Sequence, residues 1–325
     1  MQGPRKISQI RSKELKMKVF ISTTTFAKYS KEPLSILKKH GLDYGMNPYG
    51  RKLKEAEIGD ILKENSYAGL IAGTEPLTGK VLKAAGSLKA ISRVGVGLDN
   101  IDLEAAKKQN IKVRNTPSVL IDSVAELTIG LILCCLRRIT SADRNIRRNV
   151  WKKEMGLLLK GKTLGIIGFG GIGKRVAQMA KVFGLKVLFH DIKRLKLKAY
   201  EQVSLDRLLE ESDIISIHSS TKDLLISKKE ISKMKRGAVL INTSRGTAVD
   251  EQDLYKALKT GKISVAAMDV FNNEPYSGKL RELENVVLTP HVGSYAMEAR
   301  IMMEIEAVKN LIKDLKTVPR AGNER

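Results

Sequence analysis

The sequence predicts an α/β protein whose parallel sheets are divided between two domains. Short, β-rich apolar runs alternate with amphipathic helical patterns along nearly the whole chain, and this order is typical of parallel sheets covered by helices. Most of the runs are too apolar to alternate with polar residues, as expected of strands that are buried on both faces. With 325 residues, the chain is long enough to form two cores.

Apolar runs predict the strands of both domains. The first four runs are KVFIST, AGLIAG, KAISRVG and IKVRNTP, at residues 18–23, 68–73, 89–95 and 111–117. Six more are TLGIIG, KVLFHD, DIISIHS, GAVLINT, SVAAMDVF and NVVLTP, at residues 163–168, 186–191, 213–219, 237–243, 264–271 and 285–290. Boundaries fall best near Thr116 and Pro290. We therefore expect a domain of residues 117–290, inserted into a domain of residues 18–116 and 291–325, with residues 1–17 as a basic extension.

The longest helical pattern runs from Ser118 to about Arg138 and is apolar almost throughout. A helix of this kind is either buried between domains or part of a subunit interface. A basic run, RRITSADRNIRRNVWKK, follows from Arg137 to Lys153.

The formal net charge of +23 is the unusual bulk property of the chain. It is compatible with lysines spread over solvated surfaces, or with nucleic acid, an anionic membrane or an anionic substrate as a partner. Because only 5% of the residues are aromatic, nucleic-acid bases would find few side chains to stack on. We favour the solvated-surface interpretation and do not expect a nucleic-acid partner. Contact with a polyanion remains the alternative.

Several features together predict a cytoplasmic protein. No window approaches eighteen uninterrupted apolar residues, so no membrane span is expected. The first twenty residues are charged and lack the apolar segment of a signal peptide. Cys134 and Cys135 are adjacent in an apolar stretch and are expected to be reduced core thiols. No Cys/His cluster has metal-ligand spacing, so no metal is expected.

The segment TLGIIGFGGIGKRVAQMA contains a GxGxxG motif formed by Gly168, Gly170 and Gly173. The motif follows an apolar strand and opens a helix-compatible segment, which is the context of a dinucleotide-binding loop. Gly168 would allow the tight turn, Gly170 the approach of a pyrophosphate, and Gly173 close helix-to-strand packing. The helix N-terminus would add free N–H groups and a positive dipole end. A glycine-rich turn without a ligand is the alternative.

Asp191 ends the next predicted strand, eighteen residues past Gly173. Its carboxylate would accept hydrogen bonds from the ribose hydroxyls and repel a 2′-phosphate, so NAD is favoured over NADP. Lys193 and Arg194, directly after it, weaken that preference. His218 also follows a strand and is a candidate for lining the cofactor crevice. The set expected around the cofactor comprises Gly168, Phe169, Gly170, Gly171, Ile172, Gly173, Asp191, His218, Thr243 and Gly293, and the family resemblance given below adds Asp269.

Three polar side chains follow neighbouring strands of the inserted domain. Arg245 comes after AVLINTS, Glu274 after AAMDVF, and His291 after VVLTP. Because ligands of open α/β sheets bind outside the carboxyl ends of the strands, we expect the three to converge. A guanidinium can bind a carboxylate and polarise the adjacent carbonyl. An imidazole can deliver a proton near neutral pH, and a carboxylate beside it stabilises the imidazolium. Taken singly, each residue is more often a loop or strand-end residue, so their joint placement carries the catalytic hypothesis.

With these motifs, the sequence resembles the D-2-hydroxyacid dehydrogenase family, in its D-3-phosphoglycerate dehydrogenase-like branch. The resemblance covers nearly everything from Lys18 onwards. It is carried, in family order, by RVGVGLDNIDLEAA, NTPSVLIDSVAELTIGL, GKTLGIIGFGGIGKRVA, INTSRGTAVDE, AAMDVFNNEP and LTPHVGSY. It implies two Rossmann- or flavodoxin-like domains, with the cofactor domain inserted into the substrate domain. It also implies a homodimer built on the cofactor domain, with a dimerisation arm at about residues 118–153.

The resemblance also assigns roles to individual residues. Arg245, Glu274 and His291 match the family's catalytic arginine, glutamate and histidine, and Asp269 matches the aspartate that contacts the nicotinamide carboxamide. Arg93 stands where phosphoglycerate enzymes often place a phosphate-binding arginine; a surface or salt-bridged arginine is the alternative. The loop whose backbone amides would hold the substrate carboxylate consists of Val94, Gly95, Val96 and Gly97.

Four departures from the family pattern concern the adenosine half of the cofactor and nearby loops. Ser219-Ser220-Thr221 replaces a segment that usually contains a proline, and the segment after it is a few residues shorter than usual. The loops after Asp191 and after Pro275 are also short. The C-terminal regulatory domains of the longer phosphoglycerate enzymes have no counterpart in the 325 residues, so feedback through them is not expected.

The expected function is NAD-dependent hydride transfer between the nicotinamide and C2 of a small anionic 2-hydroxy or 2-keto acid. The favoured substrate pair is 3-phosphoglycerate and phosphohydroxypyruvate. A glyoxylate or hydroxypyruvate reductase is the alternative, and an NAD-sensing corepressor or polyanion-binding protein is a third hypothesis from another class.

Overall fold

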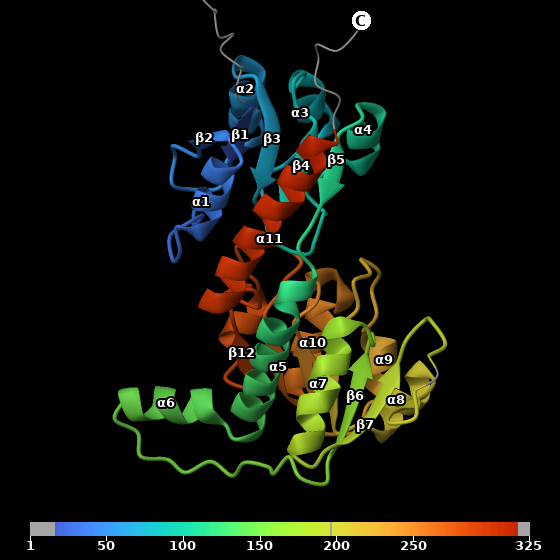
Figure 1. Ribbon diagram of the computed structural model, residues 1–325. Coiled ribbons are helices and arrows are strands. Elements are labelled where there is room, and N and C mark those ends of the chain that lie inside the picture. The colour runs from blue at the N-terminus through green and yellow to red at the C-terminus, as the bar shows by residue number, and fades with distance from the viewer. Residues whose placement is uncertain (1–16, 196, 318–325) are drawn as a thin grey trace, which may run out of the picture. The chain divides into compact units, whose positions relative to one another are not determined.

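The computed structural model describes residues 17–195 and 197–317 and divides the chain into two compact units (Figure 1). The first unit holds the described residues up to Thr116 and from Ile301 onward, and the second unit holds Pro117–Arg300. Apart from Met17, the basic extension expected at residues 1–17 lies outside the described residues. The second boundary falls after Arg300, whereas the sequence analysis placed it after Pro290. The segment in between stays with the second unit because its backbone is hydrogen-bonded to Asp269.

The first unit is built on a five-stranded parallel sheet in the order β2-β1-β3-β4-β5. Its strands are β1 (Lys18–Ile21), β2 (Asp43–Met46), β3 (Tyr67–Ala72), β4 (Ala90–Arg93) and β5 (Lys112–Arg114). Its helices are α1 (Glu32–Lys39), α2 (Glu55–Glu64), α3 (Gly79–Ala84) and α4 (Leu103–Lys108), together with α11 (Met297–Lys316), which begins in the last residues of the second unit. Asp102 starts α4 because its carboxylate accepts the N–H of Ala105 at 2.9 Å.

The second unit is built on a seven-stranded parallel sheet in the order β12-β11-β10-β9-β6-β7-β8. Its strands are β6 (Thr163–Ile167), β7 (Lys186–His190), β8 (Glu201–Gln202), β9 (Ile214–Ile217), β10 (Ala238–Asn242), β11 (Ile263–Met268) and β12 (Val286–Leu288). Its α-helices before α11 are α5 (Ile121–Leu136), α6 (Ile139–Arg147), α7 (Gly171–Val182), α8 (Leu205–Glu211), α9 (Lys228–Lys233) and α10 (Glu251–Lys259). Short 3₁₀ turns are η1 (Ser118–Leu120), η2 (Gly246–Ala248) and η3 (Lys279–Glu282).

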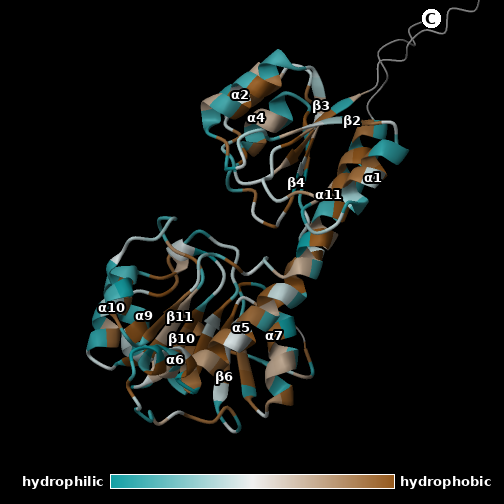
Figure 2. Cartoon of the chain, turned by 90° about the vertical axis from the view of Figure 1, so that its left-hand side faces the viewer, coloured by the Kyte–Doolittle hydropathy of each residue, from teal (hydrophilic) through white to brown (hydrophobic). Residues whose placement is uncertain are grey.

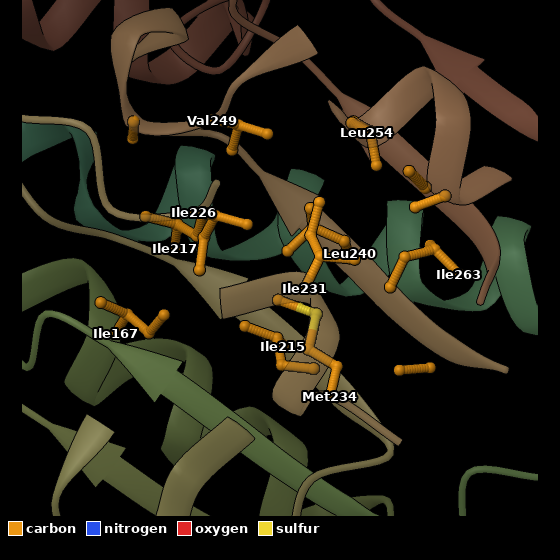
Figure 3. Packing of buried hydrophobic residues seen from close by; sticks show 14 of the residues in the cluster. Ile167, Ile215, Ile217, Ile226, Ile231, Met234, Leu240, Val249, Leu254 and Ile263 are labelled. Atoms are coloured by element: carbon orange, nitrogen blue, oxygen red, sulfur yellow. The ribbon is translucent and has the colours of Figure 1, made fainter. Parts of the chain in front are cut away.

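The sheet of the second unit is buried on both faces, as its apolar strands require. Along β10, Leu240 belongs to the hydrophobic cluster shown in Figure 3, whereas Val239 and Ile241 belong to a second cluster. Because successive side chains of a strand point to opposite faces, the two clusters cover the two sides of the sheet. The two clusters hold the strands in place, and the loops that follow the carboxyl ends of the strands lie at the edge of the sheet.

Helix α5 explains the most apolar segment of the chain. Residues Ser118–Leu136 form the one helix among the described residues that is long and apolar enough to span a membrane, and 56% of that window is buried within the structure. The helix packs against α7 and against strands β10 and β11. Figure 2 shows α5, coloured by hydropathy, among the other elements of the second unit. The composition of α5 is therefore that of a core helix.

The prediction of an α/β fold with parallel sheets is confirmed. All of the predicted strands are present, and each ends one to three residues earlier than expected. Strands β2 and β8 were not predicted. β2 has the sequence DYGM and is only partly buried, and β8 has two residues. The single helix expected from Ser118 to about Arg138 begins instead as the 3₁₀ turn η1 and ends at Leu136.

Candidate active site

The glycine loop between β6 and α7 is shaped by close backbone contacts. Gly168 has a φ of +90° and donates its N–H to the carbonyl of His190 at 2.8 Å. A Cβ at Gly168 would meet the backbone of His218 and Ser219 at 2.7–2.8 Å, and one at Gly173 would overlap the carbonyl oxygen of Gly168. At Gly170, by contrast, a Cβ would meet no atom within 4 Å. The loop is thus in close contact with other backbone atoms at Gly168 and Gly173, whereas the space beside Gly170 is open.

Asp191 holds this loop in place. Its Oδ2 accepts the N–H of Phe169 at 2.7 Å, and its Oδ1 accepts the N–H of Lys193 at 2.9 Å. The side chain of Phe169 is turned into the core, 1% exposed and stacked on Phe189. Of the expected cofactor residues, Phe169 can therefore contribute only its backbone. Each carboxylate oxygen of Asp191 retains a further lone pair for a ligand hydroxyl.

His218 and Thr243 follow β9 and β10 on the same edge of the sheet. The Nε2 of His218 is 2.8 Å from the Ser216 hydroxyl, and burial lowers the pKa of His218 to about 4. Within the part of the chain that the structure describes, the buried Nδ1 of His218 has no hydrogen-bond partner. The hydroxyl of Thr243 lies 3.1 Å from that of Thr128.

The turn that carries Arg245 is organised by Asn242, a buried residue that sequence reasoning missed. The Asn242 side-chain oxygen accepts the N–H of Ser244 at 3.0 Å, and its amide donates to the carbonyl of Arg245 at 2.9 Å. Arg245 in turn donates from Nη1 to the carbonyl of Ser244 at 2.8 Å. A Cβ at Gly246 would overlap the backbone of Phe271. The turn after β10 therefore packs directly against the loop after β11.

Glu274 and His291 form a hydrogen-bonded pair. The Glu274 Oε2 lies 2.9 Å from the His291 Nδ1, and the Glu274 Oε1 accepts the N–H of Phe271 at 3.1 Å. The His291 side chain is 55% exposed and its backbone φ is +55°. Both residues line a cavity of about 570 Å³, together with Phe271, Pro275, Tyr276, Arg281, Leu288, Thr289 and Pro290. Among the described residues, the structure records no hydrogen-bond partner for the Nε2 of His291.

Asp269 is 1% exposed and lies beneath the loop that carries His291. Its carboxylate accepts the hydroxyl of Thr289 at 2.6 Å and the N–H groups of Val292 and Gly293 at 2.8 and 3.0 Å. Burial raises the pKa of Asp269, and these hydrogen bonds oppose the rise. Thr289 is a second residue that sequence reasoning missed; its place directly after an apolar strand was the available signal.

The first unit contains the loop expected to hold a substrate carboxylate. The N–H of Val94 donates to the carbonyl of Ala72 at 2.9 Å, and the N–H of Gly95 donates to the Thr116 hydroxyl at 2.9 Å. Two of the four loop amides are therefore used inside the protein. Among the described residues, the structure records no hydrogen-bond acceptor for the N–H groups of Val96 and Gly97. Arg93 folds back on the loop and donates from Nη1 to the carbonyl of Val94 at 2.8 Å.

The edge of the second unit fits a dinucleotide. Gly170 leaves open space at the start of α7, and the first N–H groups of that helix have no intrahelical acceptor. His218 adds a buried Nδ1 that has no partner among the described residues, and Asp191 adds a carboxylate at the end of β7. The backbone N–H groups are of the kind that binds a pyrophosphate, and the carboxylate is of the kind that accepts hydrogen bonds from ribose hydroxyls.

Comparisons with known proteins agree with this geometry. Residues 129–293 match the family described as D-isomer specific 2-hydroxyacid dehydrogenase, NAD binding domain. The chain is similar to the hydroxypyruvate reductase of Thermotoga maritima, with 40% identity over 274 residues, which is 81% of this chain and 89% of that protein. It is 46% identical to the glyoxylate reductase of Thermococcus litoralis over 257 residues, covering 74% of this chain and 77% of the relative.

A longer relative and a solved structure complete the comparison. The D-3-phosphoglycerate dehydrogenase of Archaeoglobus fulgidus is 36% identical over 306 residues, which is 89% of this chain but only 56% of that protein. The crystal structure of the TT0316 protein from Thermus thermophilus superposes with a TM-score of 0.85 at 36% identity, over 92% of this chain and 97% of the other. The chain belongs to the D-isomer specific 2-hydroxyacid dehydrogenase family and is an oxidoreductase that acts on the CH–OH group of 2-hydroxy acids with NAD(P).

Proposed function

We propose that this chain is a glyoxylate or hydroxypyruvate reductase that uses NADH. The observation that carries the chemistry is the His291–Glu274 pair, 2.9 Å apart and half exposed beside a cavity. The choice of substrate is supported by two relatives of 40% and 46% identity that are named hydroxypyruvate reductase and glyoxylate reductase. Both relatives are matched over three quarters or more of their own length.

The side chains have distinct tasks in this reaction. The cofactor supplies the hydride when it is bound. Arg245 binds the substrate carboxylate and polarises the C2 carbonyl. His291 donates a proton from Nε2 to the carbonyl oxygen as that oxygen becomes a hydroxyl. Glu274 accepts a hydrogen bond from Nδ1 of His291, orients the ring and stabilises its protonated form.

The preference for NADH is supported by Asp191. A carboxylate at the end of β7 accepts ribose hydroxyls and repels a 2′-phosphate. Its own contact with the N–H of Phe169 keeps it beside the glycine loop. Lys193 and Arg194 follow Asp191 after one intervening residue and would favour a 2′-phosphate, so the same experiment must include NADPH.

Phosphohydroxypyruvate, which the sequence analysis favoured, is the second candidate substrate. It is supported by the relative named D-3-phosphoglycerate dehydrogenase, although the chain spans little more than half of that protein. Arg93 was the residue expected to bind the phosphate, yet its guanidinium folds back over its own loop. We therefore propose glyoxylate and hydroxypyruvate, the smaller and unphosphorylated acids, as the favoured substrates.

The test is an NADH-oxidation screen with glyoxylate, hydroxypyruvate, phosphohydroxypyruvate, pyruvate and longer 2-keto acids, repeated with NADPH. We expect the highest kcat/KM with glyoxylate or hydroxypyruvate. A higher value with phosphohydroxypyruvate would favour the second candidate. A chain that bound duplex DNA in salt-dependent gel shifts and reduced none of these acids would instead be a corepressor.

We also propose a homodimer through the second unit. Side chains exposed on and after α6 form an apolar set, comprising Ile139, Ile146, Val150, Trp151, Met155 and Leu158. Trp151 and Met155 are 85% and 93% exposed, which is costly for side chains of this size in a monomer. Light scattering is expected to give the mass of two chains for the wild type and a lower mass for Trp151→Glu.

A further inference from the structure

The carbonyl group of Gly293 is bound by helix α5, which takes no part in the reaction described above. Ser123, in the first turn of α5, is 8% exposed, and its hydroxyl donates to the Gly293 carbonyl at 2.6 Å. The two residues are 170 positions apart, and α5 also packs against β12, the strand that leads to this loop (Figure 1). Because Gly293 is buried, the hydroxyl satisfies a carbonyl that would be costly to leave without a partner.

Both backbone polar groups of Gly293 are engaged by neighbouring elements. Its N–H donates to the Asp269 carboxylate at the end of β11, while its carbonyl accepts the Ser123 hydroxyl from α5. A Cβ at Gly293 would lie 3.3 Å from a methyl group of Val124 and 3.3 Å from the Asp269 Oδ2. The absence of a side chain at Gly293 therefore lets the loop lie close to α5 and to the end of β11 at once.

This doubly held residue is two positions from His291, the proton donor of the proposed reaction. Beyond His291, the N–H groups of Val292 and Gly293 both bind the carboxylate of Asp269. The hydroxyl of Ser123 adds an anchor that does not depend on that carboxylate. Because proton transfer requires a donor within hydrogen-bond reach of the acceptor, a small displacement of the histidine loop is enough to slow the reaction.

We propose that Ser123 is a positioning residue for His291: its hydroxyl holds the Gly293 carbonyl and thereby sets the place from which the imidazole delivers its proton. The proposal rests on the proposed function and deepens it, since His291 is the proton donor there. Glu274 sets the orientation of the ring through Nδ1, whereas Ser123 sets the distance between the loop and α5.

The first experiment compares steady-state kinetics with glyoxylate and NADH in the wild type, Ser123→Ala and Ser123→Thr. Alanine removes the hydroxyl donor, and threonine restores it. We expect Ser123→Ala to lower kcat about tenfold while the KM for glyoxylate stays within about twofold, and Ser123→Thr to recover most of the loss. Ser232→Ala is the matched control, because it removes an exposed hydroxyl that donates to a backbone carbonyl of α9. A wild-type kcat in folded Ser123→Ala overturns the proposal.

The solvent deuterium isotope effect on kcat distinguishes positioning from a general loss of structure. A variant that only contains less folded enzyme has a lower kcat, but its isotope effect is that of the wild type. When the proton donor is displaced, proton transfer limits the rate to a greater extent, so we expect a larger isotope effect in Ser123→Ala than in the wild type. A reduced kcat with an unchanged isotope effect would make Ser123 a structural residue, and the proposal would be wrong.

Gly293→Ala decides the question if Ser123→Ala does not fold. The added methyl group would crowd Val124 and Asp269 and push the loop away from α5, although the Ser123 hydroxyl is still present. We expect a lower kcat and a larger solvent isotope effect, as in Ser123→Ala. Wild-type values of both quantities would show that the position of the loop against α5 does not control proton transfer, which would overturn the proposal.

Nuclear magnetic resonance of the histidine rings, without substrate, separates this proposal from the proposed function. The chain has four histidines, and the ring signals of His291 are identified by their absence from His291→Asn. We expect these signals to shift and broaden in Ser123→Ala and to stay unchanged in Ser232→Ala, while those of His40 stay in place in both. This result would support the role of Ser123 even if the chain reduced none of the acids in the screen. Identical His291 signals in the wild type and Ser123→Ala overturn it.

Discussion

The buried carboxylate of Asp269 accepts the backbone N–H of Gly293 at 3.0 Å and so connects the end of β11 to the loop after β12. The same carboxylate binds the Thr289 hydroxyl and the N–H of Val292, on either side of His291. His291 has a left-handed backbone with a φ of +55°, a conformation that few residues other than glycine adopt without support. Asp269 provides that support, in addition to any contact that it makes with a nicotinamide carboxamide.

Asp269→Asn is expected to destabilise the second unit by about 2 kcal/mol and to lower kcat. An amide can accept one of the backbone N–H groups, but its NH₂ group would face another donor and leave a buried polar group unsatisfied. Urea denaturation and steady-state kinetics measure the two effects. Asp60→Asn, at an exposed position of α2, controls for the loss of an aspartate. Wild-type stability and kcat in Asp269→Asn would show that the loop does not depend on this carboxylate.

The sequence predicted that Arg245, Glu274 and His291 converge at one edge, because parallel strands present their carboxyl ends on the same side. The structure joins Glu274 and His291 by a hydrogen bond, and the approach of Arg245 to them stays a prediction. The sequence could not predict that Asp269 holds the histidine loop, since that contact joins residues 24 positions apart. The same holds for Arg93. Its position before the loop suggested a phosphate ligand, whereas in the structure its Nη1 donates to the Val94 carbonyl of the same loop. The alternation of side chains along a strand predicts the face of the sheet from which each side chain projects. The final direction of a side chain depends on tertiary contacts, which the sequence alone does not reveal.

His291→Asn is expected to lower kcat about 100-fold or more, as found when acid–base catalysis is lost. Asparagine tolerates the left-handed backbone at this position, so the loop keeps its conformation while the proton donor is removed. Kinetics with glyoxylate and NADH measure kcat, and circular dichroism checks the fold. His40→Asn, at the exposed C-terminus of α1, is the matched control. A near-wild-type kcat in His291→Asn would exclude the histidine as the proton donor.

Asp191→Ala is expected to weaken NADH binding about tenfold or more and to improve NADPH relative to NADH. The substitution removes the carboxylate that would bind the ribose hydroxyls, and it also leaves the N–H of Phe169 without its acceptor. We therefore expect a loss of stability of about 1 kcal/mol as well. KM values for both cofactors and thermal denaturation measure these effects. If the ratio of NADH to NADPH efficiency does not change, Asp191 has no part in the ribose site.

Stability near pH 5 is expected to depend on His218. Burial lowers the pKa of this residue to about 4, whereas an unfolded histidine takes up its proton near pH 6.5. Between these values the unfolded chain binds more protons than the folded chain, so stability falls as the pH drops from 6.5 toward 4. His218→Gln removes this effect. On going from pH 7 to 4.5, the wild type should lose on the order of 1 kcal/mol more of its free energy of unfolding than His218→Gln loses. Urea denaturation at both pH values measures the difference, with His40→Gln as the control for an exposed histidine. Equal losses in wild type and His218→Gln would mean that the ring of His218 is solvated in the folded protein.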